Sequence, residues 1–131
     1  MSPFAASVSG RHPGMDAEHR VQLALIQALC DAVEEGAESG AIGRILDQLV
    51  DYSKAHFLSE ELLMRLDSYD GFDEHVEDHA DMLDSLAAMV DTYRIGKSEL
   101  IPGQARKVLA FLVRHIETRD ARYVNAPMAR L

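Results

Sequence analysis

Tryptophan is absent from this chain of 131 residues, cysteine occurs only once, and no hydrophobic run approaches the length needed to cross a membrane. The single cysteine, Cys30, excludes a disulfide within the chain and fits a reducing compartment. The first fourteen residues, MSPFAASVSGRHPG, lack the apolar core of a signal peptide. We therefore expect a soluble cytoplasmic protein.

Basic residues are also scarce. Thirteen lysines and arginines stand against 22 aspartates and glutamates, which gives a formal net charge of -9. Nucleic acid and anionic membrane surfaces both require clustered basic side chains, so neither is an expected partner. The hydrophobic fraction of 47% is sufficient for one globular domain with a real core.

Apolar residues recur at intervals of three and four in four segments separated by turn signals. This pattern predicts helices over about 16–38, 42–66, 73–94 and 102–120. Short connections between them indicate an all-α, up-down-up-down antiparallel four-helix bundle. We expect an irregular N-terminal arm over residues 1–14, a domain over 15–125 and a C-terminal tail over 126–131.

Five of the six histidines form a spaced set with one glutamate and one aspartate. The seven residues are His19, His56, Glu60, His75, His79, His115 and Asp120. They fall near the starts of the first and third predicted helices and near the ends of the second and fourth. In an up-down bundle these ends lie together, so all seven should converge within roughly 10 Å along the axis. The sixth histidine, His12, lies on the predicted arm and is not an expected ligand.

The spacing within this set indicates a metal site. His56 and Glu60 are four residues apart, as are His75 and His79, so each pair shares a helix face. His115 and Asp120 are five apart, about 140° out of phase on a regular helix, so Asp120 requires a loosened turn or a bulge.

The donor atoms narrow the choice of metal. Seven donors exceed the four that structural zinc takes, and calcium and magnesium prefer oxygen. Two iron ions bridged by the carboxylates would use all seven.

These residues also match a known family. The chain resembles the hemerythrins, most closely the bacterial hemerythrin domains, over about residues 15–125. The matching pieces are Asp16-Ala17-Glu18-His19, Tyr52, His56-Phe57, Glu60-Glu61, Met64, His75, His79, His115-Ile116, Asp120 and Tyr123.

The resemblance implies a division of the ligands between two iron ions (Fe2+/Fe3+). His75, His79 and His115 would bind one iron, and His19 and His56 the other. Glu60 and Asp120 would bridge them together with an oxo or hydroxo group. Dioxygen would bind reversibly as a hydroperoxide at the iron that has two histidines. The residues implied for the oxygen pocket are Gln22, Phe57, Phe111, Leu112 and Ile116.

The chain departs from the family pattern at three places. It has no tryptophan, Asp70 follows Tyr69 where many relatives have proline, and Gln22 is polar where an apolar residue is common. A polar group near the open iron could admit water or donate a hydrogen bond. We therefore hypothesise that Gln22 hastens oxidation to the diferric state, which would favour sensing over long-lived oxygen storage.

Three functions are compatible with the sequence. The first is reversible dioxygen binding for storage, delivery or scavenging, without enzymatic activity. The second is an oxygen or redox sensory domain that signals to an effector domain or partner. The third is turnover of peroxide or nitric oxide. Ferritin-like oxidases use carboxylate-rich sites with a Glu-x-x-His pattern, which this chain lacks, and that argues against oxidase chemistry.

Four further expectations concern individual side chains and assembly. Glu61 should be a solvated helix residue, with a hydrogen bond to a ligand histidine as the alternative. Cys30 and the methionines Met64, Met82 and Met89 should fill the core. The sequence does not decide whether the chain is a complete protein or an excised domain. We expect a monomer, because no long exposed apolar stripe is evident.

Overall fold

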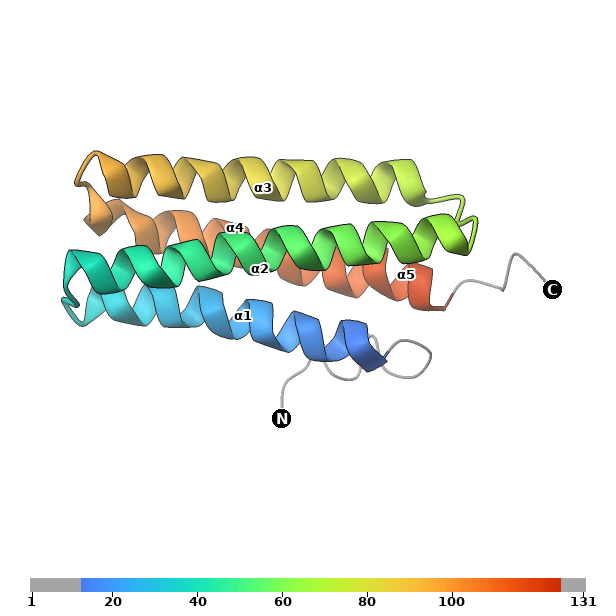
Figure 1. Ribbon diagram of the computed structural model, residues 1–131, viewed down its shortest axis with the longest axis horizontal. Helices are drawn as coiled ribbons and strands as arrows, with labels where there is room; N and C mark the ends of the chain where they lie inside the picture. Colours follow the sequence, from blue (N-terminus) through green and yellow to red (C-terminus); the bar gives the residue numbers. More distant parts are fainter. Residues whose placement is uncertain (1–12, 126–131) are drawn as a thin grey trace.

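The computed structural model describes residues 13–125 (Figure 1). Residues 1–12 and 126–131 lie outside this range, and with them most of the predicted arm, the predicted tail and His12. The elements are α1 (Pro13–Glu34), α2 (Ser39–Leu66), α3 (Phe72–Arg94), η1 (Ser98–Leu100), α4 (Ile101–His115), η2 (Ile116–Asp120) and α5 (Ala121–Val124). No strand occurs among them, which confirms the all-α prediction.

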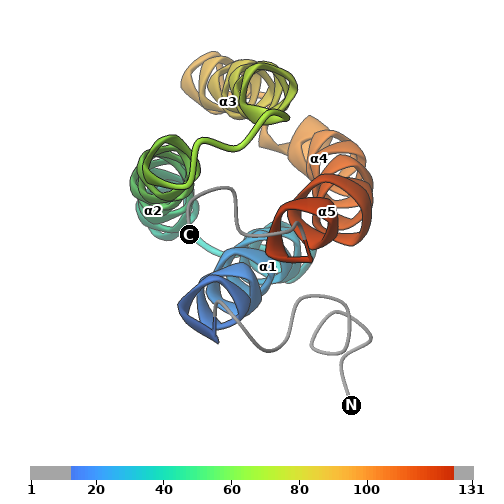
Figure 2. The same ribbon diagram turned by 90° about the vertical axis from the view of Figure 1, so that its right-hand side faces the viewer.

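The four long helices run antiparallel and form a closed ring. Each contacts the next along the chain, and α4 returns to contact α1 (Figure 2). The bundle encloses a main hydrophobic core and a smaller apolar cluster of Met64, Tyr123 and Val124. This is the up-down-up-down arrangement that the short connections predict. Its consequence for function is that the start of α1, the end of α2, the start of α3 and the end of α4 meet at one end of the molecule.

Three of these helices end in the same hydrogen-bonded turn. After α1, the N–H of Ala37 donates to the carbonyl of Ala32, with Gly36 at a φ of 75°. Gly96 has the equivalent place after α3, with a φ of 78°. After α2 the equivalent position is occupied by Ser68, with a φ of 52°. This left-handed conformation is energetically unfavourable for a residue that has a side chain. Because the turn at Gly36 ends α1, this helix stops at Glu34, four residues before the predicted boundary at 38.

The core confirms the expected fillers. Met64, Met82 and Met89 are at most 2% exposed, and Cys30 is also buried. Burial raises the pKa of the Cys30 thiol, which suits a small core residue and not a reactive thiolate.

One feature of the surface differs from the prediction. Leu58, Leu62 and Leu66 follow one another at intervals of four on the outer face of α2, and each is more than half exposed. An apolar stripe is therefore present where none was expected. The sequence did not reveal it because α2 is rich in leucine on both faces, and only packing selects the face that turns inward. Within residues 13–125, no helix has the length and hydropathy needed to cross a membrane.

Candidate metal centre

The bundle brings all seven predicted residues together at one end of its core. We call them the seven-residue cluster: His19 from α1, His56 and Glu60 from α2, His75 and His79 from α3, His115 from α4 and Asp120 from η2. Every one of these side chains is at most 2% exposed. Because ionisable groups are rarely buried without a partner, a cluster of this density indicates a dedicated site.

Asp120 reaches the cluster through a local change of helix type. Residues Ile116–Asp120 form a turn of π-helix, in which the repeat widens from four residues to five. His115 and Asp120, five residues apart, therefore share one face. Their approach is close, with His115 Nε2 3.2 Å from Asp120 Oδ1. The predicted irregularity before Asp120 is confirmed.

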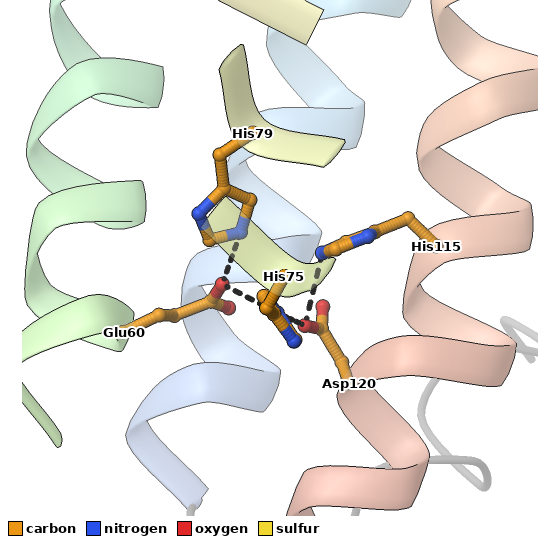
Figure 3. Close-up of side chains that lie close together, drawn as sticks. All are labelled: Glu60, His75, His79, His115 and Asp120. Atoms are coloured by element: carbon orange, nitrogen blue, oxygen red, sulfur yellow. Dashed lines mark ion pairs between the residues drawn. The ribbon is translucent and has the colours of Figure 1, made fainter. Parts of the chain in front are cut away.

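The cluster divides into two groups of donor atoms that share Glu60. One group holds Glu60, His75, His79, His115 and Asp120 (Figure 3), and the other holds His19, His56 and Glu60. Each group could surround one metal ion, because its donor atoms lie within 4.8 Å of one another.

The two carboxylates face both groups, one oxygen toward each. Glu60 Oε2 lies 2.8 Å from His56 Nε2, and Oε1 lies 2.9 Å from His79 Nε2. Asp120 repeats the arrangement, with Oδ2 2.8 Å from His19 Nε2 and Oδ1 2.6 Å from His75 Nε2. This is the disposition of carboxylates that bridge two ions.

Although several of these buried atoms lie within ion-pair distance of one another, many of them form no hydrogen bond among the described residues. They include Nε2 of His56, His75, His79 and His115, Oε1 of Glu60 and both carboxylate oxygens of Asp120. An unsatisfied buried polar atom is costly, and so many at one point require another occupant. Metal ions, which accept lone pairs from imidazole and carboxylate alike, meet that requirement.

The metal-free site is strongly polarised. Burial alone would lower the pKa of His19 and of His75, but the carboxylates of Asp120 and Glu60 beside them outweigh it and raise each pKa to about 9. Burial would likewise raise the pKa of Glu60, yet the four imidazoles around it hold that pKa well below its usual range. The free site therefore retains protons that a metal has to displace.

Three outer carboxylates hold the far side of the imidazoles. His56 Nδ1 donates to Glu18 Oε1 at 2.6 Å, and His79 Nδ1 donates to Glu61 Oε2 at 2.8 Å. His115 Nδ1 donates to Asp78 Oδ2 at 3.0 Å. These bonds fix the Nδ1 proton and leave the Nε2 lone pair facing the cluster.

The three outer carboxylates share one pattern. Each is adjacent in sequence to a residue of the seven-residue cluster. Each accepts a hydrogen bond from a histidine on the following helix: Glu18 on α1 from α2, Glu61 on α2 from α3, and Asp78 on α3 from α4. The hydrogen bond from a cluster histidine to Glu61, which was the alternative to a solvated Glu61, is thus confirmed. Sequence reasoning missed Glu18 and Asp78. The only signal was that each precedes a cluster histidine, His19 or His79, in the sequence. In a chain with 22 acidic residues, an acidic neighbour of a histidine is too common to be specific.

The five residues predicted to line the oxygen pocket differ in how deeply they are buried. Gln22, Phe57, Leu112 and Ile116 are at most 2% exposed, and the Phe57 ring stacks on His79 with centroids 4.1 Å apart. Phe111 is only partly buried and lines a pocket at the surface, beside Asp78 and His115. It also packs against the hydrophobic core, so its ring lies between the core and that surface pocket.

Gln22 is one half of a buried polar pair. Its Nε2 donates to Ser53 Oγ at 2.8 Å, while its Oε1 is buried without a partner among the described residues. Gln22 follows His19 by one turn and Ser53 precedes His56 by one turn, so the pair lies on the core side of these two histidines.

Comparisons with known proteins agree with this geometry. A family model described as the hemerythrin HHE cation binding domain matches residues 13–126. The bacteriohemerythrin of Methylococcus capsulatus is 32% identical over 121 residues, which cover 92% of each chain. The myohemerythrin of Theromyzon tessulatum is 26% identical, covering 83% of this chain and 79% of that one. A crystal structure of wild-type hemerythrin superposes with a TM-score of 0.84 at 28% identity, covering 100% of this chain and 98% of that chain.

Proposed function

Because this chain belongs to the hemerythrin family, we propose that the seven-residue cluster binds two iron ions and that the protein binds dioxygen reversibly there. His75, His79 and His115 would hold one iron, and His19 and His56 the other. Glu60 and Asp120 would bridge them. The iron pair would supply the electrons and the open coordination position that dioxygen requires.

The observation that carries this proposal is the orientation of the two carboxylates. Each of them directs one oxygen to the group with three histidines and the other oxygen to the group with two. A single-ion site has no use for that arrangement. The unequal number of imidazoles supports one saturated and one open ion, and mixed imidazole and carboxylate donors suit iron.

The chain's own residues would keep the site dry and its ligands fixed. All seven side chains are shielded from solvent, and Phe57 covers the face of His79. Glu18, Glu61 and Asp78 hold three of the imidazoles in orientation from outside. Such a site supports binding of a small neutral molecule more than turnover of a larger substrate, so we propose a binding role in storage, delivery or scavenging of dioxygen, and no enzymatic activity.

A second candidate function is oxygen or redox sensing, and the Gln22–Ser53 pair favours it. The unpartnered Oε1 of Gln22 is buried one turn from His19, where it could hold a water molecule beside the open iron. Water there would promote oxidation of the iron pair, and a site that oxidises readily reports oxygen better than it stores it.

Iron stoichiometry and absorption spectra test the proposal. Protein purified in air, reduced without oxygen and then exposed to oxygen should contain two irons per chain. It should also develop a charge-transfer band that vanishes under argon. His75→Ala should lower the stoichiometry, whereas His12→Ala, the sixth histidine, is the matched control and should not.

Other outcomes decide among the functions. Two irons that convert at once to a stable diferric spectrum would favour the sensor. One metal ion per chain, or none, in protein supplied with iron would contradict the diiron proposal.

A further inference from the structure

A pocket open to the surface lies between α3 and the C-terminal end of α4, on the outer side of the candidate metal centre. It encloses about 280 Å³. Its lining comes from Asp78 on α3 and, along α4 to α5, from Phe111, Arg114, His115, Thr118, Arg119 and Arg122. The lining residue that belongs to the seven-residue cluster is the buried His115, so the pocket is separated from the cluster by one imidazole.

The pocket concentrates positive charge on an acidic protein. The chain has a net charge of -9 and thirteen basic side chains, and three of those thirteen line this one pocket. The π-turn contributes to this arrangement, because its wider repeat brings Arg119 to the same side of the helix as Arg114. Clustered cations in a concave site focus the local potential and attract anions.

Two of the three arginines have no ion-pair partner among the described side chains. The Arg119 guanidinium pairs with Asp78, at 3.1 Å from Nε to Oδ2, and also with Glu74. By contrast, no carboxylate among the described side chains, those of residues 17–125, forms an ion pair with Arg114 or Arg122, both of which are exposed. Their planar guanidinium groups carry the donors for two-point recognition of a carboxylate.

The remaining lining residues indicate that the ligand also has an apolar part. The Phe111 ring and the aliphatic stems of the arginines give the pocket an apolar wall. A bare inorganic anion would leave that wall uncovered, whereas a small apolar group attached to a carboxylate would fill it.

We propose that this pocket, which we call the arginine pocket, binds a small carboxylate anion that has an apolar body. Arg114 and Arg122 would hold the carboxylate, and Phe111 would contact the apolar body. Arg119 would stay with Asp78, whose Oδ2 also accepts the Nδ1 proton of His115. The bound anion would therefore lie next to the carboxylate that orients a candidate metal ligand.

Equilibrium dialysis of the iron-loaded full chain tests this with three probes: benzoate, its uncharged counterpart benzamide, and inorganic phosphate. We expect saturable binding of one benzoate per chain. Benzamide lacks the charge and phosphate lacks the apolar body, so each should bind at least about tenfold more weakly. Equal binding of benzamide or of phosphate would overturn the proposed ligand class.

Paired variants locate the site. The double substitution Arg114→Gln/Arg122→Gln should weaken benzoate binding by about tenfold or more. The control, Arg44→Gln/Arg94→Gln, removes the same charge from two exposed arginines at the opposite end of the bundle and should leave binding unchanged. If benzoate binds the Arg114/Arg122 variant as well as it binds the wild type, the arginine pocket is not its site. A change in the iron absorption spectrum would then show that benzoate binds at the metal.

Discussion

His115 and Asp120 present their side chains to the same point although they are five residues apart, with Nε2 3.2 Å from Oδ1. The turn of π-helix between them makes this possible, because a regular α-helix would place them about 140° apart. The π-turn therefore accommodates the five-residue interval and brings Asp120 into the cluster.

Removing a residue from this turn should leave iron binding intact, whereas adding one should impair it. Deletion of Thr118 would restore a regular helix with the aspartate four residues after His115, only about 40° away, so iron stoichiometry should stay at two. Insertion of one alanine after Thr118 would turn the aspartate off this face and should reduce the stoichiometry. Iron analysis of both variants measures the difference, and equal iron content in the two would contradict the role given to the turn.

The outer carboxylates should control how tightly metal is held. Glu61→Gln removes the acceptor charge behind His79 and should weaken iron binding by about tenfold to a hundredfold. Glu77→Gln, on the exposed face of α3, is the matched control and should have no effect. Competition with a chelator of known affinity measures both. Equal retention of iron by the two variants would show that the hydrogen bond does not contribute.

The metal-free protein should lose stability as the pH rises. On folding, the pKa values of His19 and His75 rise from 6.5 to about 9. A group whose pKa is raised stabilises the fold fully below its unfolded value, and this contribution is lost as the pH rises through the folded value. Thermal unfolding of metal-free protein should therefore have a lower midpoint at pH 9 than at pH 6.5.

Bound iron should remove that loss of stability. Bound metal replaces the protons on the imidazoles, so the loaded protein should not lose stability over the same interval, and metal binding should release protons. Circular dichroism melts with and without iron at the two pH values give the comparison. A metal-free midpoint that is flat or rises toward pH 9 would contradict the polarised site described above.

Gln22 offers a test of storage against sensing. Gln22→Leu combined with Ser53→Ala removes both halves of the buried polar pair without leaving either one unpartnered. Oxidation of the reduced, iron-loaded protein in air should then slow by about tenfold, the equivalent of one hydrogen bond. The control is Gln27→Ala, an exposed position on the same helix. An unchanged rate in the double variant would exclude Gln22 as the cause of oxidation.

Ser68 should be a site of easy stabilisation. It has a φ of 52° at a helix end where the other two equivalent turns have glycine. Ser68→Gly should raise the free energy of unfolding by about 0.5–1 kcal/mol, since glycine adopts this conformation without steric cost. Ser85→Gly, in the exposed middle of α3, should instead lower it by about 0.5 kcal/mol. Denaturant titration distinguishes the two, and a loss of stability in Ser68→Gly would show that the turn is not strained.

The predicted helices and their order were sufficient to place the seven-residue cluster. Histidines and carboxylates at helix starts and ends meet in an up-down bundle because short connections allow no other neighbours. The helix ends at Gly36 and Gly96 also have a local cause, although the predicted first helix ran four residues past the observed end of α1. Even the irregular turn at Asp120 followed from the spacing alone, because a fixed helical repeat makes a five-residue interval geometrically inconsistent.

Side-chain partners between helices depend on how far each helix is rotated about its axis, and that rotation is set by packing of the whole core. Only the tertiary structure therefore paired Glu18 with His56 and Asp78 with His115. It also turned Leu58, Leu62 and Leu66 outward while Met64 filled the core. The arginine pocket also depends on this packing: its arginines lie along the continuous segment from α4 to α5, but Asp78 lines it from α3.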